Sequence, residues 1–376
     1  CEWVIEVDGK VIRSGERDFA IPPGETITTR IPSFPRRESK GEVFLHLKWV
    51  SVHPNGWSGE GHLVAWDQIQ LKGKRPDFTP QIPKIRQKFT LLESQIVENN
   101  GFKIELPSAT EKGSITYKGR ELFSTFPVAS FWRPPTDNDG VQQGWMAEVS
   151  GVRRAWIEEG LNSLNTFYSE PKCTKRSNGL IIILEANHEG ANATAFHRST
   201  MEIVNGEIRF SEYIHVPDEW SDVPRVGVRF ETSKQFTELE WFGCGPLESY
   251  PDRYQSQMIS RWSSTVREQF HSYVVPQENG AHQKTRWFSL SDGGNDGIQI
   301  QTREPISFSA SHYHDMEITT ATKISELKPN KTIEVHVDRA LRGLGTAACG
   351  PDALKAYRVG SGIYRWQWSL KPSKPA

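Results

Sequence analysis

FWRPPTDNDG, at residues 131–140, is the stretch that departs most clearly from the β-strand patterns of this chain. It has neither helical nor strand periodicity. Pro134 and Pro135 remove backbone donors and fix φ, so neither a helix nor a central strand passes through it. Two aromatic residues and an arginine come first, and a short acidic turn that ends in glycine follows. A loop this rich in special residues usually has its shape imposed by something it contacts.

Strand patterns dominate the chain on both sides of this loop. Short runs of alternating apolar and polar residues, bounded by turn residues, indicate antiparallel strands packed as a large sandwich. Asn205-Gly206 is the strongest hairpin signal. The one good helix candidate is residues 149–164, where apolar residues fall near helical spacing. We expect strands within residues 3–11 (a hairpin), 25–31, 43–52, 62–71, 89–98, 102–106, 113–117, 180–184, 201–204, 207–210, 236–241, 297–301, 332–338 and 363–370.

Length and composition predict the domain organisation. A length of 376 residues fits two domains better than one or three. Residues 1–72 are expected to form a small all-β unit, residues 73–84 a polar, proline-bearing linker, and residues 85–376 a larger β-dominated domain. The predicted fold class is therefore all-β, with one or two short helices.

Charge and hydropathy exclude several classes of partner. The net charge is −1, the pI is about 6.9 and no basic block occurs, so we expect neither nucleic-acid nor membrane binding. No apolar run approaches the length of a membrane span, and no signal peptide is recognisable. The chain begins at Cys1 within an alternating strand pattern, which predicts a fragment or a processed product.

The cysteines indicate a compartment. Cys1, Cys173, Cys244 and Cys349 are widely spaced and form no CxxC pair. This pattern is typical of free thiols in a reducing environment. We therefore expect a cytoplasmic protein.

Two clusters of polar residues are candidates for chemistry. Asp137 and Asp139 are either a paired-carboxylate site, as glycoside hydrolysis requires, or a turn that caps its own backbone; the turn is the commoner use of such residues. His312, His314 and Asp315 are either part of a metal site or residues of an exposed strand. The sequence offers no further ligand for a metal, so we favour the exposed strand.

Two further stretches crowd glycine, proline, aromatic and charged residues together. They are WFGCGPLESYPDR at residues 241–253 and VPQENG at residues 275–280, the latter followed by Thr285-Arg286-Trp287. Each stretch is either a tight turn from a strand into a loop or one side of a polar cleft that is lined by aromatic side chains. Composition alone favours the turn.

The order of these stretches resembles a known family. Residues 55–66, 131–140, 243–253 and 273–280 occur in the same order as motifs in the C-terminal third of the large microbial β-galactosidases of glycoside hydrolase family 2. The closing strand at residues 364–370 is also similar, so the resemblance covers essentially the whole chain. Long motifs in one order are far more specific than any one of them.

The resemblance implies a more specific fold. Residues 1–72 would be most of the family's fourth domain, a truncated immunoglobulin-like β-sandwich. Residues 85–376 would be its fifth domain, a large antiparallel β-supersandwich of the galactose-mutarotase type. Residues 73–84 remain the linker between them.

The resemblance also implies a function. The family hydrolyses lactose and other β-D-galactosides with retention, through two glutamates in a TIM barrel that precedes the fourth domain. This chain does not contain the barrel, so we expect no catalytic residue in it and no activity of the chain alone. In the family the fifth domain helps to shape the sugar cleft. This makes Arg133, Asp137, Asn138, Asp139 and Gly140 substrate-cleft candidates.

Two details of the family's cleft bear on this chain. A mobile active-site loop follows the acidic turn in the family and would lie at residues 140–145 here. The family also places a sugar-stacking Trp after a Gly-x-Gly turn, whereas residues 343–351 read GLGTAACGP and contain no Trp. Cys349 does not replace such a platform by stacking.

We expect no cofactor or metal in this chain, because the family's magnesium and sodium ions lie mostly at sites outside it. The expected partners are a β-galactoside, the N-terminal and barrel part of the enzyme or a partner chain, and further copies of the whole enzyme in an oligomer. One alternative function is a non-catalytic carbohydrate-binding or complementing small subunit. Another is a mutarotase-like epimerase, for which the candidate bases are His271, His282, His312 and His314.

Overall fold

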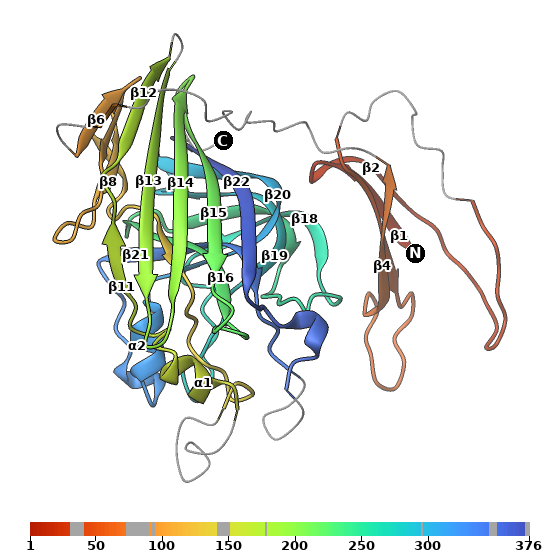
Figure 1. The fold of residues 1–376 in the computed structure, drawn as a ribbon. Coiled ribbons are helices and arrows are strands. Elements are labelled where there is room, and N and C mark those ends of the chain that lie inside the picture. The colour runs from red at the N-terminus through yellow and green to blue at the C-terminus, as the bar shows by residue number, and fades with distance from the viewer. Residues whose placement is uncertain are drawn as a thin grey trace. The chain divides into compact units, whose positions relative to one another are not determined.

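The structure, a computed structural model, describes residues 1–30, 41–72, 90–91, 95–140, 151–176, 179–294, 296–345 and 352–372. The chain divides into two compact units. Unit 1 comprises Cys1–Phe78 with Met258–Arg261, and unit 2 comprises Thr79–Gln257 with Trp262–Ala376. The predicted linker at residues 73–84 lies outside the described residues. Strands provide most of the regular structure in both units (Figure 1).

Unit 1 contains one antiparallel sheet. In spatial order its strands are β2 (Lys10–Glu16), β1 (Glu2–Val7), β3 (Val43–Val50) and β4 (Leu63–Lys72). The predicted hairpin is confirmed, with Asp8 at φ 50° and Gly9 at φ 75° in its turn. Ile5, Val43 and Leu45 form the buried apolar cluster of this sheet. The described residues of this unit form a single four-stranded sheet, and the truncated immunoglobulin-like sandwich stays a prediction.

The strand predicted at residues 25–31 is wrong for the part that the structure describes, because residues 25–30 form neither helix nor strand. All of these residues are exposed, including Ile27 at 47%. β-propensity stabilises a strand only where its side chains pack against a neighbour. No described strand pairs with this segment, so its alternating pattern does not produce a strand.

Unit 2 is dominated by one large antiparallel sheet. Its main path runs through β10 (Val128–Ser130), β16 (Arg225–Ser233), β21 (Thr332–Leu341), β20 (Gly297–Ser311), β22 (Gly362–Pro372), β15 (Glu207–Val216), β14 (Thr194–Val204), β13 (Gly179–Glu189), β12 (Lys172–Arg176) and β5 (Thr90–Leu91). Off this path, β11 (Asn165–Tyr168) pairs with β13, and β17 (Glu238–Gly245) pairs with β18 (Met258–Thr265) and β19 (His282–Ser291). The first four residues of β18, Met258–Arg261, are those counted with unit 1. A separate sheet contains β6 (Ile96–Asn99), β7 (Phe102–Glu105), β8 (Ser114–Tyr117) and β9 (Arg120–Phe123).

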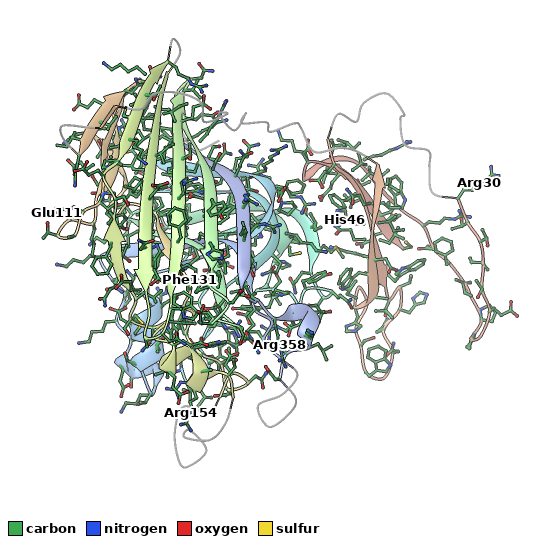
Figure 2. All side chains as sticks on the ribbon, in the orientation of Figure 1. Arg30, His46, Glu111, Phe131, Arg154 and Arg358 are labelled. Carbon is green, nitrogen blue, oxygen red and sulfur yellow. The ribbon has the colours of Figure 1, made fainter. Side chains whose placement is uncertain are left out.

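Period-two burial along the strands explains how the large sheet encloses a core. Along β14 and β15, buried residues mostly alternate with half-buried or exposed ones, so one face of the sheet points inward. The rings of Phe210 and Trp368 stack with centroids 4.0 Å apart, and Phe123 stacks on Phe230 at 3.8 Å. Phe131, labelled in Figure 2, is also buried, and its ring lies edge-on to that of His188 on β13 with centroids 5.7 Å apart. This packing produces the antiparallel supersandwich that the resemblance implies.

Two short α-helices complete unit 2. The predicted helix is present but shorter, at α1 (Arg153–Glu158), because Gly151 at φ 82° and Gly160 at φ 78° interrupt the helical backbone on either side. Trp156 is its one buried residue. The sequence pattern does not predict α2 (Asp315–Thr320), since its β-branched residues favour strands. Among the described residues, 3₁₀ turns occur at η2 (Ile324–Glu326) and η3 (Lys355–Tyr357). No helix among the described residues is long and apolar enough to cross a membrane.

A histidine is buried in the core of unit 2. His188 on β13 is 1% exposed, and its Nδ1 lies 3.0 Å from the hydroxyl of Thr166. Burial, with a smaller contribution from His197, lowers the pKa of His188 to about 3. The folded protein therefore keeps this side chain neutral at pH values at which the unfolded chain binds a proton.

We predict that replacing His188 by Gln makes the protein more resistant to acid. In the wild-type protein, His188 contributes a loss of stability as the pH falls from about 6.5 towards 3, because only the unfolded state binds a proton on His188 there. His188→Gln removes this loss, so its urea midpoint drops less between neutral and acidic pH. The matched control is His215→Gln on exposed His215 of β15, which should behave as wild type. Equal acid sensitivity of wild type and His188→Gln would contradict the prediction.

Candidate functional site

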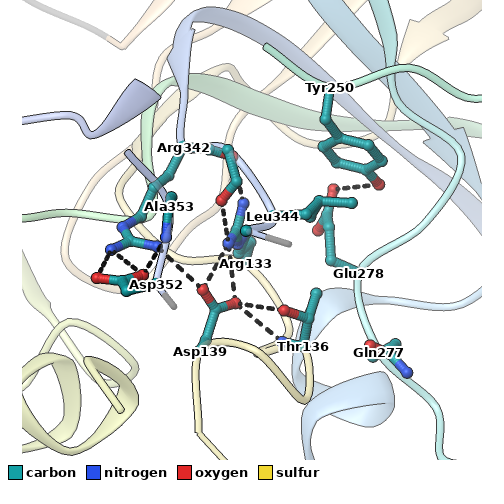
Figure 3. A network of polar contacts seen from close by, with 12 residues as sticks. Arg133, Thr136, Asp139, Tyr250, Gln277, Glu278, Arg342, Leu344, Asp352 and Ala353 are labelled. Atoms are coloured by element: carbon teal, nitrogen blue, oxygen red, sulfur yellow. Dashed lines mark hydrogen bonds and ion pairs between the residues drawn. The ribbon is translucent and has the colours of Figure 1, made fainter. Parts of the chain in front are cut away.

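A buried ion pair fixes the loop at residues 131–140 (Figure 3). Arg133 and Asp139 are both 0% exposed, and Nη2 of Arg133 donates to Oδ1 and Oδ2 of Asp139 at 2.7 and 2.8 Å. Oδ2 also accepts from the backbone N–H and the hydroxyl of Thr136, at 2.9 and 3.1 Å. The carboxylate of Asp139 therefore closes the loop onto its own first half.

A second buried arginine, Arg342, follows β21 and joins this pair. Its Nη1 lies 3.4 Å from Oδ1 of Asp139. The same guanidinium donates to Asp222 at 2.8 and 3.0 Å and to Asp352 at 2.8 and 2.9 Å. Arg358 contacts Asp352 at 3.0 Å. We refer to the following residues as the arginine cluster: Arg133, Asp139, Asp222, Arg342, Asp352 and Arg358.

The arginine cluster is electrically balanced. Three guanidinium groups face three carboxylates, so its formal charges sum to zero at neutral pH. Because each buried charge has a partner of opposite sign, mutual attraction offsets much of the cost of removing it from water. The cluster therefore offers no net charge to an ionic ligand.

The indole of Trp156 packs against both buried arginines. The guanidinium carbons of Arg133 and Arg342 each lie 5.7 Å from the centre of its ring, within cation–π range. Nε1 of Trp156 donates to the carbonyl of Asp222 at 2.9 Å. Helix α1 is thus attached to the arginine cluster through its one buried residue.

The turn at residues 343–345 is held from two sides. Arg133 donates to the carbonyls of Arg342 and Gly343, at 2.5 and 3.1 Å. On the other side, the carboxylate of Asp252 accepts from the next two backbone N–H groups, at 3.0 and 2.8 Å. Segments that lie far apart in the sequence, at residues 133, 252 and 343, therefore meet at one turn.

Glycines bring the start of α1 close to the loop. The carbonyl of Asp139 accepts from the N–H of Arg153 at 2.8 Å. A Cβ at Gly151, which has φ 82°, would approach that carbonyl to 2.1 Å, so no other residue fits there. Gly140, at φ 143°, also needs glycine. The predicted active-site loop beyond Gly140 lies outside the described residues.

A second buried cluster surrounds Arg225 at the start of β16. Nη2 of Arg225 donates to Glu278 at 3.1 Å, Nη1 donates to Asp315 at 3.1 Å, and Nε lies 3.2 Å from Asp338. The hydroxyl of Tyr250 donates to Glu278 at 3.4 Å. Together these residues are the Arg225 cluster. It contains one guanidinium for three carboxyl groups.

Glu278 connects the Arg225 cluster to the proline-rich loop. Its backbone N–H donates to the carbonyl of Pro134 at 3.2 Å. The side-chain oxygen of the neighbouring Gln277 accepts from the N–H of Asp137 at 3.3 Å. The stretch at residues 275–280, for which the sequence leaves two interpretations, therefore packs directly against the loop.

Burial raises the pKa of Glu278 to about 7; Arg225 opposes this rise and Asp315 adds to it. Burial is the main physical reason, because it disfavours the charged form of the carboxyl group, and the neighbouring carboxylate of Asp315 adds to the effect. The carboxyl group of Glu278 therefore titrates near neutral pH.

Three potential metal ligands lie beside Arg225. Oxygen and nitrogen atoms of Asp315, Glu334 and His336 lie within 4.8 Å of one another. However, Nη1 of Arg225 donates to Nδ1 of His336 at 2.6 Å, so Nδ1 is an acceptor and the imidazole proton lies on Nε2. Nε2 faces Asp315 at 3.3 Å and Glu334 at 3.6 Å. Because a protonated nitrogen does not bind a cation, we assign these residues to the hydrogen-bond network.

The geometry also argues against a metal site formed by His312, His314 and Asp315. Nε2 of His314 lies 3.2 Å from the hydroxyl of Thr332, and Asp315 binds Arg225 instead. His312 is half-buried, and burial lowers its pKa. These three side chains do not converge on one point.

The candidate epimerase bases are also separated. His282 is buried, its Nε2 lies 2.7 Å from Gln269, and burial lowers its pKa to about 4. His271 is exposed and lies outside both clusters. Among the described residues, neither imidazole is paired with a carboxylate of the candidate site.

The predicted cleft residues divide into two groups. Arg133 and Asp139 are brought together and fully buried, and Gly140 is buried beside them. Asp137 and Asn138 are partly exposed. This arrangement favours the turn over the paired-carboxylate site, because Asp139 bonds to arginine and to its own loop. Contact of Asp137 or Asn138 with a sugar stays a prediction.

Sequence reasoning missed Arg342, Asp222, Asp352 and Arg225. Arg342 lies 203 residues from Asp139, so no local pattern connects them. One signal was available: Arg342 directly follows an apolar strand, and a charged residue in that position needs a buried partner.

A cleft adjoins the turn at residues 343–345. This proximal cleft has a volume of about 460 Å³. It combines apolar and aromatic side chains with a few polar groups, as small-molecule sites do. Its lining includes Pro251, Asp252, Arg253, Tyr254, Ser256, Gly345, Leu354 and Tyr357.

Comparison with known families matches both parts of the chain. The family described as the β-galactosidase small chain matches residues 98–370. The family described as β-galactosidase domain 4 matches residues 1–72. The first match alone covers well over half of the chain.

Two relatives give the same picture. The β-galactosidase of Kluyveromyces lactis is 28% identical in an alignment 321 positions long that covers 82% of this chain and 30% of the relative. The β-galactosidase of Arthrobacter sp. (strain B7) is 27% identical in an alignment 381 positions long that covers 93% of this chain and 36% of the relative. The chain thus spans about a third of the length of the relatives that it matches.

Solved structures show only a distant similarity. The aldose epimerase homologue from C. elegans has a TM-score of 0.40 at 10% identity, over 77% of this chain and 100% of that chain. A putative aldose 1-epimerase from Escherichia coli K12 has a TM-score of 0.39 at 10% identity, over 77% and 100% of the two chains. These values are too low to support an inference about function.

We predict that Asp139→Asn destabilises unit 2 by about 3–5 kcal/mol, because it removes the carboxylate shared by two buried arginines. Asp137→Asn in the same loop is the matched control. Asp137 is partly exposed and forms no ion pair with a described residue, so a change below about 0.5 kcal/mol is expected. Urea unfolding followed by tryptophan fluorescence measures both. Equal effects of the two substitutions would show that Asp139 is not the anchor.

We also predict a pH dependence from Glu278. Its carboxyl group binds a proton up to about pH 7 in the folded state but only up to about pH 4.5 in the unfolded state. Glu278 therefore contributes a loss of stability as the pH rises between these values, by at most about 1.4 kcal/mol per pH unit. Glu278→Gln lacks this loss. The free energy of unfolding of the variant therefore rises relative to that of wild type as the pH increases towards 7. Glu121→Gln, at an exposed position of β9, is the control. A difference that does not change with pH would overturn the assignment.

Proposed function

This chain belongs to the β-galactosidase small-chain family, and we propose that it is the C-terminal part of an enzyme that hydrolyses terminal β-D-galactose from β-galactosides such as lactose. The relatives that it matches are named β-galactosidases and are about three times as long as the region they share with it. We assign the hydrolysis to the whole protein. The role of this chain is to shape the sugar cleft.

The arginine cluster is the observation that carries this proposal. It holds the loop at residues 131–140 against the turn at residues 343–345, beside the proximal cleft. Its charges cancel, which suits an uncharged ligand such as a galactoside. Asp137 and Asn138 are the partly exposed side chains of the loop, and we propose that they face the sugar.

The carboxylates of the site support a non-catalytic role for this chain. Retaining glycoside hydrolysis uses two carboxyl groups about 5 Å apart, one as the nucleophile and one as the acid. Asp139, Asp222 and Asp352 are bonded to arginine instead. Glu278 is buried beside Arg225. We therefore propose that the catalytic pair comes from another part of the whole protein.

Exposed aliphatic side chains near the site support a docking surface for that part. Val274 is 90% exposed, directly before the stretch at residues 275–280 that packs on the loop. Leu354 is 64% exposed and lines the proximal cleft. Exposed apolar side chains beside a functional site are typical of interaction surfaces. We propose that the catalytic part packs here and that the whole enzyme forms an oligomer.

We propose a cytoplasmic location and no cofactor bound by this chain. Cys1, Cys173 and Cys244 are free, which supports a reducing compartment. The family description as a small chain favours one alternative, in which the chain is a separate subunit that complements a catalytic chain.

The test is complementation. We expect the purified chain alone to leave 4-nitrophenyl β-D-galactoside intact, because the carboxylates of the candidate site form ion pairs with arginines. Co-expression with the Arthrobacter relative truncated before the shared region, in a host without β-galactosidase, should restore hydrolysis. The truncated relative alone and a co-expressed Asp139→Asn variant are the controls, and both should remain inactive. Hydrolysis by the chain alone, or no gain on co-expression, would refute the proposal.

A further inference from the structure

A second cleft adjoins the proximal cleft. This distal cleft has a volume of about 580 Å³. Arg253 and Ser256 line both clefts, so the two meet along the turn at residues 251–256. Its lining includes Trp241, Pro246, Leu247, Glu248, Gln257, Ser263, Glu268, Gln269, Phe270 and His271.

We propose that the proximal and distal clefts form one continuous groove for a neutral oligosaccharide longer than a disaccharide. This inference rests on the proposed function, because the proximal cleft is taken as the place where the galactoside enters. It adds a class of substrate: β-galactosides whose leaving group is itself an oligosaccharide. The volume of each cleft lies within the range of about 300–1,000 Å³ found for small-molecule sites.

The charges in the distal cleft favour a neutral ligand. The guanidinium of Arg253 forms an ion pair with Glu248, whose other oxygen accepts from the N–H of Gly280 at 2.8 Å. Glu268 adds a second carboxylate, and hydrogen bonds from Ser264 and Thr265 lower its pKa. One guanidinium therefore faces two carboxylates, which disfavours phosphate, sulfate and acidic sugars.

Arg253 is held in place at the junction of the two clefts. Its guanidinium carbon lies 5.5 Å from the centre of the Tyr250 ring, and Glu248 fixes it from the side. The hydroxyl of Tyr273 donates to Glu248 at 2.6 Å and completes this frame. The arginine side chain is still 48% exposed. A donor that is ordered before binding loses little conformational entropy when it binds a sugar hydroxyl.

The distal cleft combines apolar surfaces with polar groups, as sugars require. Pro246 and Leu247 are exposed, Leu247 to 68%, and Phe270 is half-buried. Such surfaces pack against the C–H faces of a pyranose ring. The imidazole of His271 is exposed, rests edge-on against Tyr273 at 4.3 Å and has no hydrogen-bond partner among the described residues. It is therefore available to a sugar hydroxyl at the far end of the groove.

The test compares two sugars on the full chain: lactose and a β-1,4-linked galactotetraose. Both are titrated by calorimetry. We expect the tetraose to bind at least about tenfold more tightly than lactose, because it alone reaches the distal cleft. His271→Ala should weaken tetraose binding by about three- to tenfold and leave lactose binding unchanged.

A second variant blocks the cleft by size. Ser263→Trp introduces an indole at an exposed position of the distal lining and should remove the tetraose advantage. Ser163→Trp, at an exposed position outside both clefts, is the matched control and should keep it. Circular dichroism and urea midpoints confirm that the variants remain folded.

The outcomes separate this inference from the proposed function. Equal affinity for both sugars, or an unchanged tetraose advantage in both distal variants, overturns the continuous groove and leaves the proposed function standing. Failure of both sugars to bind also overturns the groove, while the complementation assay decides the proposed function independently. The groove is supported if the tetraose binds more tightly than lactose and if this advantage is reduced or lost in His271→Ala and Ser263→Trp but kept in Ser163→Trp.

Discussion

The ion pairs of Asp139 with two fully buried arginines are the interactions on which one end of unit 2 depends. A guanidinium group buried without a carboxylate would carry an uncompensated charge into a medium that solvates it poorly. Arg133 and Arg342 come from a loop and from a strand end, so their common partner holds these two elements together. Trp156 then attaches α1 to the same point through its indole ring.

Strand register places the second cluster beside the first. Arg225 pairs with Leu341 in the antiparallel ladder of β16 and β21, and Arg342 follows Leu341 directly. Both buried arginines are therefore set at the same end of the sheet by the pairing that forms the core. The turn at residues 343–345, which adjoins the proximal cleft, starts from this end of the sheet, so strand pairing also sets the position of this side of the cleft. The arginine cluster beside the turn is electrically neutral.

The sequence predicted much of the local structure, because turns and period-two burial are local properties. Asn205-Gly206 adopts φ values of 50° and 76° in the turn between β14 and β15, as this dipeptide indicates. The pattern failed where a neighbour decides the outcome. Residues 25–30 alternate but have no described strand to pair with, and β16, which the sequence reading did not identify, is a strand because β10 and β21 flank it. The strand predicted at residues 89–98 corresponds to β5 and β6, which belong to different sheets.

By itself, the sequence determined that the chain is all-β, that residues 131–140 form a constrained loop, and that its motifs follow the order of the β-galactosidase family. These conclusions depend on short-range chemistry: prolines that exclude regular structure, glycines at turns and alternating side chains. Only the tertiary structure decided what Asp139 does, because its partner Arg342 lies 203 residues away and reaches it through the pairing of strands. The same holds for Glu278, whose burial beside Arg225 sets its pKa. Burial and charge pairing depend on which residues are neighbours in the folded chain. These neighbours are distant in the sequence and come together only when the strands pair.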